Sequence, residues 1–182
     1  MCRKIFILFT FILLANCVVK KRTTYSKTRT VTVTSSEGES ETKTRKKRKK
    51  RSEENNEADK IIATALTFSG TRYRFGGTTK KGMDCSGLVY TSLRENQIEF
   101  PRISHEMATK GKRIQLGKVQ RGDLLFFNTK KRGKRINHVG LVVKVAGDDI
   151  QFIHSTTSRG VIVSSLREGF WNHSFIKATR IL

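Results

Sequence analysis

Cys85 is the residue in this sequence whose type and surroundings best suit nucleophilic chemistry. It lies in the run Gly82-Met83-Asp84-Cys85-Ser86-Gly87, and Leu88, Val89 and Leu93 follow at the spacing of one helix face. A helix start presents unpaired N–H groups and the positive end of the helix dipole, which lower the pKa of a thiol and favour the thiolate. The sequence therefore predicts a reactive cysteine at a helix start; a buried structural cysteine is the alternative.

Two glycines, Gly82 and Gly87, flank this cysteine. Because glycine has no side chain, it permits a tight turn and lets another chain approach closely. We expect both glycines to give a substrate peptide access to the sulfur.

A cysteine nucleophile needs a base that accepts its proton and later returns it to the leaving amine, and imidazole suits both tasks. His138 opens a strand expected over residues 139–145, and His154 closes the next strand, one hairpin away. In that arrangement the second imidazole can orient the first by a ring-to-ring hydrogen bond. The residues predict a triad of Cys85, His138 and His154.

The other two histidines, His105 and His173, lie in polar surroundings, which favour surface or packing roles. A zinc site built from the triad residues is an alternative, but it lacks the closely spaced ligand pairs typical of such sites. The thiol mechanism itself requires no metal and no organic cofactor.

The spacing of apolar residues changes along the chain, and this change predicts the helices and strands that position the triad. A folded domain is expected over residues 58–182, where Ile61, Ile62, Ala65 and Leu66 share one helix face and Asn56 and Asp59 are candidate helix caps. The Cys85 helix comes next, and a short polar helix is expected from residue 105 to about residue 111. Short β-rich runs follow at residues 124–127, 139–145, 150–153, 160–163 and 175–178. Helices followed by strands indicate an α+β domain with an antiparallel sheet.

The N-terminus has the features of an export signal over residues 1–16. Arg3 and Lys4 precede an apolar run at residues 5–14, which ends in Leu14-Ala15-Asn16-Cys17. This ending resembles the lipobox of bacterial lipoproteins, in which the chain is cut before the cysteine and the new N-terminal cysteine is lipidated. An uncleaved signal anchor, with Cys17 incidental, is the alternative.

Export leaves Cys85 without a partner for an internal disulfide. Cys2 departs with the signal, and Cys17 becomes the site of lipidation. A single remaining thiol outside the cytoplasm is expected to be reactive, or else paired with another chain.

Charge is concentrated in the segment at residues 17–57, which we interpret as a lipidated cysteine followed by a disordered tether. The chain has 37 Lys and Arg against 15 Asp and Glu, and residues 45–51 are an unbroken basic run. No aromatic residues are interleaved in that run for base stacking, so nucleic acid is not an expected partner. Anionic wall polymers or lipid head groups are the expected partners of the tether.

Several motifs in order resemble the NlpC/P60 family of cell-wall cysteine peptidases. They are Tyr73-Arg74-Phe75-Gly76-Gly77, Asp84-Cys85-Ser86-Gly87, Pro101-Arg102, Gly122-Asp123-Leu124-Leu125-Phe126-Phe127, His138-Val139-Gly140 and Phe152-Ile153-His154-Ser155. The resemblance implies a papain-like fold that cuts amide bonds in the peptide stems or cross-links of peptidoglycan. It implies Cys85 as nucleophile, His138 as base and His154 as the residue that orients the base.

The resemblance also implies roles for residues around the triad. Tyr73 would lie beside the nucleophile and help the Cys85 backbone N–H to bind the oxyanion. Asp84, Ser86, Arg102 and Ser104 fall where family members line the substrate groove. Their alternatives are helix caps for Asp84, Ser86 and Ser104, and a solvated loop charge for Arg102.

The lipid anchor, basic tether and single domain look most like the small murein endopeptidase lipoproteins of Gram-negative bacteria. This likeness implies a membrane-anchored protein of the cell envelope, on the periplasmic face, with peptidoglycan peptides as substrate. A D-alanyl cross-link and a γ-D-glutamyl stem bond would use the same triad. A non-catalytic wall-binding scaffold of the same fold and a papain-like amidase or acyltransferase are the alternatives.

Overall fold

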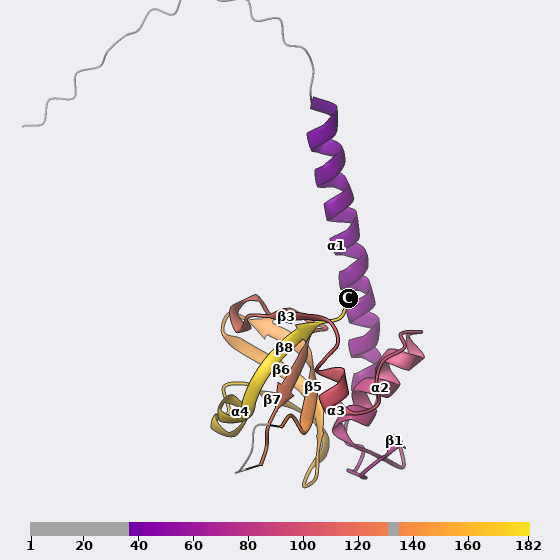
Figure 1. The fold of residues 1–182 in the computed structure, drawn as a ribbon. Helices are drawn as coiled ribbons and strands as arrows, with labels where there is room; N and C mark the ends of the chain where they lie inside the picture. Colours follow the sequence, from indigo (N-terminus) through magenta and orange to yellow (C-terminus); the bar gives the residue numbers. More distant parts are fainter. Residues whose placement is uncertain (1–36, 131–134) are drawn as a thin grey trace, which may run out of the picture. The chain divides into compact units, whose positions relative to one another are not determined.

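The computed structural model describes residues 37–130 and 135–182, with side chains from residue 45 onward; most of its helical residues precede the strands of the main sheet (Figure 1). The helices are α1 (Glu37–Leu66), α2 (Cys85–Glu95), α3 (Ser104–Met107), the 3-10 turn η1 (Leu116–Lys118) and α4 (Gly169–Ser174). The strands are β1 (Thr78–Thr79), β2 (Gly82–Met83), β3 (Lys112–Ile114), β4 (Leu124–Phe127), β5 (His138–Ala146), β6 (Asp149–Thr156), β7 (Gly160–Ser165) and β8 (Phe175–Arg180).

The main sheet has six strands in the order β3-β8-β4-β5-β6-β7, and every pair in it is antiparallel. The predicted α+β class with an antiparallel sheet is therefore confirmed. All five β-rich runs that the sequence indicated become strands.

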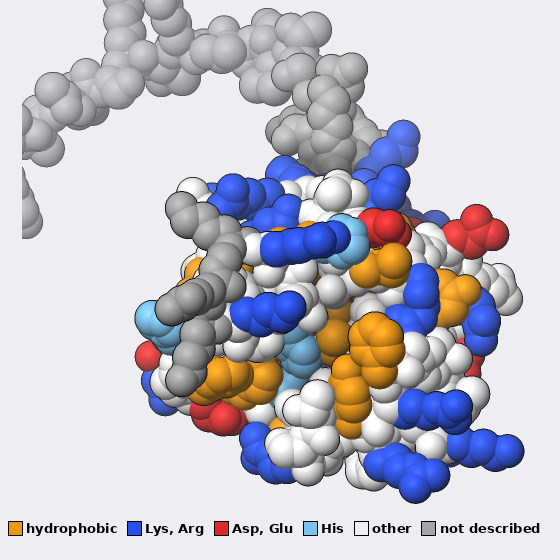
Figure 2. Space-filling view, turned by 60° about the horizontal axis from the view of Figure 1, so that its bottom comes forward, with side chains coloured by type: hydrophobic (Ala, Val, Ile, Leu, Met, Phe, Trp, Pro, Cys, Tyr) orange, Lys and Arg blue, Asp and Glu red, His pale blue; other side chains and the backbone are white. Residues whose placement is uncertain are grey.

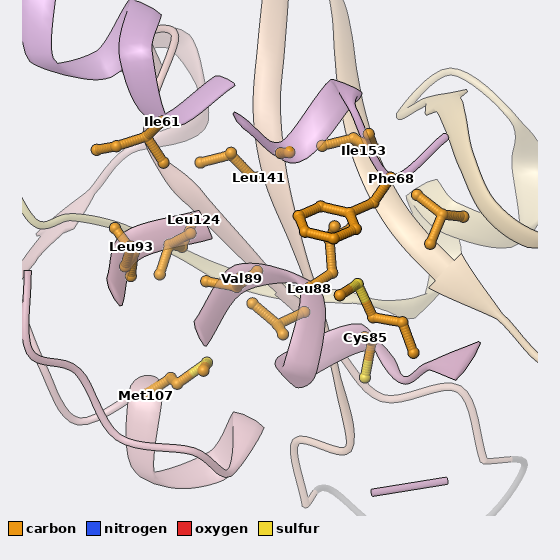
Figure 3. Close-up of a cluster of buried hydrophobic side chains, with 14 of the residues drawn as sticks. Ile61, Phe68, Cys85, Leu88, Val89, Leu93, Met107, Leu124, Leu141 and Ile153 are labelled. Atoms are coloured by element: carbon orange, nitrogen blue, oxygen red, sulfur yellow. The ribbon is translucent and has the colours of Figure 1, made fainter. Parts of the chain in front are cut away.

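Strand β4 divides the hydrophobic core because its alternate side chains face opposite sides of the sheet. Leu124 and Phe126 join a cluster with residues of α1 and α2, whereas Leu125 and Phe127 join a second cluster with Trp171 of α4. Figure 3 shows the first cluster, in which α2 lies against side chains from α1 and from the sheet. The helix that carries Cys85 is thus fixed to the sheet that carries both catalytic histidine candidates.

Helix α1 starts earlier than the sequence indicated. Residues 37–57, which we predicted to be part of a disordered tether, are helical, so Asn56 and Asp59 do not cap the helix. Arginine, lysine and glutamate favour helix, and Lys49–Glu53 and Lys50–Glu54 form ion pairs at i,i+4 spacing, 4.0 and 3.7 Å long. The first buried side chain of the described part of α1 is Ala58, where the predicted domain begins.

The predicted signal at residues 1–16, with Cys2, and the lipidation site Cys17 lie outside the described residues. Among the helices of the described part, none combines the length and the apolar character needed to cross a membrane.

Three short elements differ from the sequence-based expectation. The polar helix expected to about residue 111 ends at Met107, while β3 and α4 were not predicted. Lys112 and Arg113 are exposed, so β3 carries no alternating apolar signal, and six-residue α4 is too short to show a helical period.

Gly87 shows that the start of α2 is tightly packed. A Cβ atom at Gly87 would collide with the backbone carbonyl oxygen of Gly77, and one at Gly82 would lie 2.5 Å from the Cβ of Arg74. Both glycines therefore have a packing role. Gly87 lets the loop at residues 74–77 pack directly on α2, and Gly82 lets β2 pack against Arg74.

We therefore expect Gly87→Ala to destabilise the protein by about 1–3 kcal/mol, because the colliding atom belongs to the rigid backbone. The measurement is urea unfolding followed by circular dichroism. Gly117→Ala is the matched control, since a Cβ there meets nothing within 4 Å. Equal unfolding midpoints for the two variants would contradict this account of the helix start.

Candidate active site

Cys85 is the first residue of α2, and Asp84 is the residue that caps the helix. The Asp84 carboxylate accepts a hydrogen bond of 2.6 Å from the backbone N–H of Gly87, as an N-cap side chain does. Cys85 is 8% exposed, and in Figure 3 its sulfur points away from the labelled aliphatic side chains. The predicted position of the thiol at a helix start is confirmed.

Cys85 lines a hollow with a volume of about 730 Å³. Figure 2 shows a face of the molecule on which histidine and hydrophobic side chains lie in a hollow, with Lys and Arg side chains around it. The lining residues are Tyr73, Phe75, Cys85, Thr129, Lys130, Asn137, His138, Ser155, Thr156, Thr157, Ser158, Arg159, Glu168, Phe170 and Trp171. We call this hollow the catalytic groove.

His138 and His154 form the hydrogen bond that the sequence indicated. His138 is the first residue of β5, His154 lies in the neighbouring strand β6, and their Nε2 and Nδ1 atoms are 2.9 Å apart. Both side chains are buried. Because His138 and Cys85 line the same groove, the structure brings all three predicted triad residues together.

A third polar group, Ser164 of β7, extends this pair. The Nε2 atom of His154 lies 3.0 Å from the Ser164 hydroxyl, which is also buried. If His138 is to accept a proton at Nδ1, its Nε2 must carry hydrogen and donate to His154. His154 then carries hydrogen on Nε2 and donates it to Ser164, so every nitrogen has one consistent role. This arrangement differs from the zinc alternative, in which lone pairs of both rings would point at a common ion.

Aromatic side chains enclose the two imidazoles. Trp171 stacks on His138 with ring centroids 5.2 Å apart and meets His154 edge-on at 4.4 Å, while Phe152 lies against His154 at 4.7 Å. Gly140 allows this packing, because a Cβ atom there would lie 2.4 Å from the ring of Phe152. The rings therefore have little freedom to rotate away from one another.

This apolar enclosure controls the pKa values of the triad. Burial lowers the pKa of His138 to about 4, and burial together with the neighbouring ring lowers the pKa of His154. Burial also raises the pKa of the Cys85 thiol, with a further rise from the Asp84 charge; N–H groups at the helix start and at Val139 oppose it. The N–H groups at the helix start lower the thiol pKa as expected, but desolvation outweighs them, so the expected net lowering was wrong. Both shifts favour a thiol and a neutral imidazole at rest.

Asp84, Ser86 and Arg102 form one network that holds the start of α2. Arg102 donates to both Asp84 oxygens at 3.0 and 2.9 Å, to the Ser86 hydroxyl at 2.8 Å and to the Gly77 carbonyl at 3.3 Å. Asp84 also accepts from the Gly76 N–H at 2.8 Å. Asp84 thus has the capping role, and none of these three side chains lines the catalytic groove.

The Arg102 guanidinium and the backbone N–H groups of Gly87 and Gly76 keep the pKa of Asp84 below its usual value although burial raises it. Ser104, the fourth residue expected to line the groove, is buried and has no capping bond at α3. It lines a separate, smaller hollow.

Tyr73 and Ser155 complete the surroundings of the nucleophile. Tyr73 pairs with Met83 in an isolated bridge and lines the groove, and burial together with the nearby Cys85 and Asp84 raises the pKa of its hydroxyl. The Ser155 hydroxyl donates to the Met83 carbonyl at 2.7 Å and so joins β6 to the segment before Cys85.

Sequence reasoning missed the roles of Ser155 and Ser164, because serines in strands give no signal until the strand register is known. The remaining histidines lie apart from the triad, as predicted: His105 is half-buried in α3 and His173 is exposed in α4.

Comparison with known proteins agrees with this geometry. The model of the NlpC/P60 family matches residues 70–180. The murein DD-endopeptidase MepS/murein LD-carboxypeptidase of Escherichia coli K12 is 39% identical over 124 residues, which cover 68% of this chain and 62% of that protein. The probable endopeptidase NlpC of Escherichia coli K12 is 40% identical over 116 residues, which cover 63% of this chain and 72% of that protein.

A solved structure shows the same fold. The crystal structure of an NlpC/P60 family protein from Bacillus cereus superimposes with a TM-score of 0.63 at 29% identity, and the match covers 69% of this chain and 40% of that one. The expected family, inferred from motifs, is thereby confirmed over the part of the chain that carries Cys85, His138 and His154. The chain belongs to the NlpC/P60 family.

Proposed function

We propose that this protein is a cell-wall hydrolase, a cysteine endopeptidase that cleaves amide bonds in murein peptides through an acyl-enzyme. The observation that carries the proposal is the shared groove of Cys85 and His138, with His138 held through its other nitrogen by His154. Family membership and relatives named as murein endopeptidases support the same reaction.

The geometry supports the following sequence of proton transfers. His138 Nδ1 accepts the Cys85 thiol proton as the sulfur attacks the amide carbonyl, and the Cys85 backbone N–H and Tyr73 stabilise the oxyanion. The imidazolium returns the proton to the leaving amine, and a thioester on Cys85 remains. His138 then takes a proton from water, which hydrolyses the thioester and regenerates the thiol.

His154 and Ser164 act through His138. Their hydrogen bonds hold the His138 ring in the tautomer whose Nδ1 can accept a proton. The positive charge that develops on His138 during the reaction is then stabilised by its hydrogen bond to His154 inside the apolar enclosure.

Two further features belong to the proposal. Anchoring of the protein in the envelope through lipidated Cys17 rests on the sequence of residues 1–17. Binding of anionic wall or lipid surfaces rests on the exposed basic side chains at residues 45–51 of α1.

Two bonds are candidates for cleavage. The relative named as a murein DD-endopeptidase favours the D-alanyl cross-link. A γ-D-glutamyl stem bond is the second candidate, because the same triad would serve it. A wall-binding scaffold and a papain-like amidase or acyltransferase remain alternatives that product analysis separates.

Mass spectrometry of murein and of defined muropeptides tests the proposal. Cys85→Ala and His138→Ala should each lower hydrolysis by at least about 10⁴-fold, because the members of a nucleophile–base pair act as a unit. Circular dichroism should show that both variants remain folded. Monomers released from dimers identify a D,D-endopeptidase, and shortened stems identify a γ-D-glutamyl endopeptidase. A folded, fully active Cys85→Ala protein would refute thiol catalysis.

The pH dependence of kcat/KM should reflect the lowered pKa of His138. The base works only when it is deprotonated, so activity falls as pH drops through its pKa of about 4 and not through its ordinary value of 6.5. We expect a nearly constant kcat/KM between about pH 7 and 5, with circular dichroism confirming folded protein at each pH. A fall centred near 6.5 would show that the His138 ring is solvated.

Removing Arg102 should raise the thiol pKa further. Arg102 neutralises Asp84, whose charge opposes the thiolate next to it, so Arg102→Gln leaves that carboxylate uncompensated. The rate of Cys85 alkylation by iodoacetamide should then rise only at higher pH than in the unaltered protein. Arg121→Gln is the control, because Arg121 pairs with Asp59 and lies outside this network. Identical alkylation profiles for Arg102→Gln and the unaltered protein would contradict the shielding role.

A further inference from the structure

A second, basic hollow adjoins the catalytic groove. It has a volume of about 270 Å³ and is lined by Ser104, His105, Lys130, Arg135, Ile136 and Asn137. Lys130 and Asn137 also line the catalytic groove, so the two hollows share a border immediately before the catalytic base His138. A peptide that lies across Cys85 can therefore extend into the basic hollow.

The border between the two hollows is held in place by a side-chain clamp. The Asn137 side chain accepts from the Thr129 N–H at 2.9 Å and donates to the Thr129 hydroxyl at 3.1 Å. The Asn137 N–H donates to the Phe127 carbonyl at 3.1 Å, and the Lys130 N–H donates to the Asn128 side chain at 3.0 Å. These bonds fix the path of the backbone after β4, up to Lys130, and again just before His138.

The positive charge of the basic hollow is not cancelled within the described residues. Arg135 Nη2 lies 3.3 Å from His105 Nε2, so its nearest side-chain partner is an imidazole and not a carboxylate. Across residues 45–130 and 135–182, no carboxylate lies within 4.0 Å of Lys130 or Arg135. The sequence itself has no Asp or Glu between Asp123 and Asp148.

Acidic groups nearby do not compensate this charge. Glu168 lines the catalytic groove, but one of its oxygens accepts from the Ser165 N–H at 2.9 Å, and Glu168 does not line the basic hollow. Glu106 follows His105 in α3, is exposed and forms no ion pair within the described part. Arg159 adds a further positive charge to the wall of the catalytic groove.

We propose that the basic hollow is a subsite for a free carboxylate of the substrate peptide, bound by Arg135 and Lys130. An arginine fork fits a carboxylate with two parallel hydrogen bonds, and the lysine supplies a second point charge. Murein stems offer such groups, because a γ-linked glutamate keeps its α-carboxylate and each stem ends in a carboxylate. The inference rests on the proposed function, and it names what the groove selects: peptides that are anionic beside the scissile bond.

Matched substrates test this subsite. The full chain is incubated with two defined muropeptides of the same length. One carries free carboxylates at the glutamate α-position and at the end of the stem, and the other carries carboxamides at both positions. KM should be lower for the carboxylate peptide. Arg135→Gln should raise that KM about tenfold, equivalent to about 1.4 kcal/mol, with kcat within about twofold. KM for the amidated peptide should stay unchanged, since it offers no charge to bind.

Lys112→Gln is the matched control, because it removes an equal charge from the exposed edge strand β3. Its KM values for both peptides should equal those of the unaltered protein. Lys130→Gln should behave like Arg135→Gln with a smaller effect. Equal KM values for the two peptides in the unaltered protein, or equal losses on both peptides in Arg135→Gln, would overturn the proposal.

Calorimetric binding separates failure of this subsite from failure of the proposed catalysis. The same two peptides are titrated into the Cys85→Ala protein and into the Cys85→Ala, Arg135→Gln double variant. The first should prefer the carboxylate peptide about tenfold, and the double variant should not discriminate. This preference would support the subsite even if the chain were a non-hydrolytic scaffold. Absence of any preference in Cys85→Ala would refute the subsite while leaving hydrolysis by the unaltered protein standing.

Discussion

The buried hydrogen bond between His138 and His154 is the interaction on which the rest of the site depends. It joins the Nε2 and Nδ1 atoms at 2.9 Å, within an enclosure formed by Trp171 and Phe152. A polar chain in such surroundings is stable only when each member is satisfied, and Ser164 completes this one. These contacts, and not the solvent, therefore determine which nitrogen of His138 is free to accept a proton.

The two hydrophobic clusters explain how Cys85 and His138 come from different parts of the chain yet meet in one groove. Strand β4 contributes alternate side chains to each cluster, so the layer with α2 and the layer with Trp171 share one sheet. Ser155 adds a direct bond from β6 to the Met83 carbonyl, two residues before Cys85. Arg102 also holds the helix start, through its ion pair with Asp84. The geometry of the site therefore depends on long-range contacts that a short motif does not encode.

Sequence reasoning found the residue types of the triad, because a lone thiol, a helix start and two strand-end histidines each have a local signature. It could not find Ser164 or Ser155, since their roles depend on strand register. It assigned Arg102 to the groove, whereas the side chain lies in the Asp84 network, because the path of the loop after α2 has no local pattern. It also gave the wrong sign for the thiol pKa, since burial depends on the whole fold. The helical part of residues 37–57 was missed because charge pairing, without apolar periodicity, supports it.

Nitrogen-15 NMR of the histidine rings near pH 6 tests the central claim most directly, because it reports the protonation of each ring nitrogen in the folded protein. The account predicts two neutral imidazoles, with His138 and His154 each carrying hydrogen on Nε2 and none on Nδ1. It also predicts that replacing Ser164 with alanine leaves His138 neutral but weakens the preference of His154 for that tautomer. Protonation of both nitrogens of His138 at this pH would contradict the neutral imidazole on which the mechanism rests.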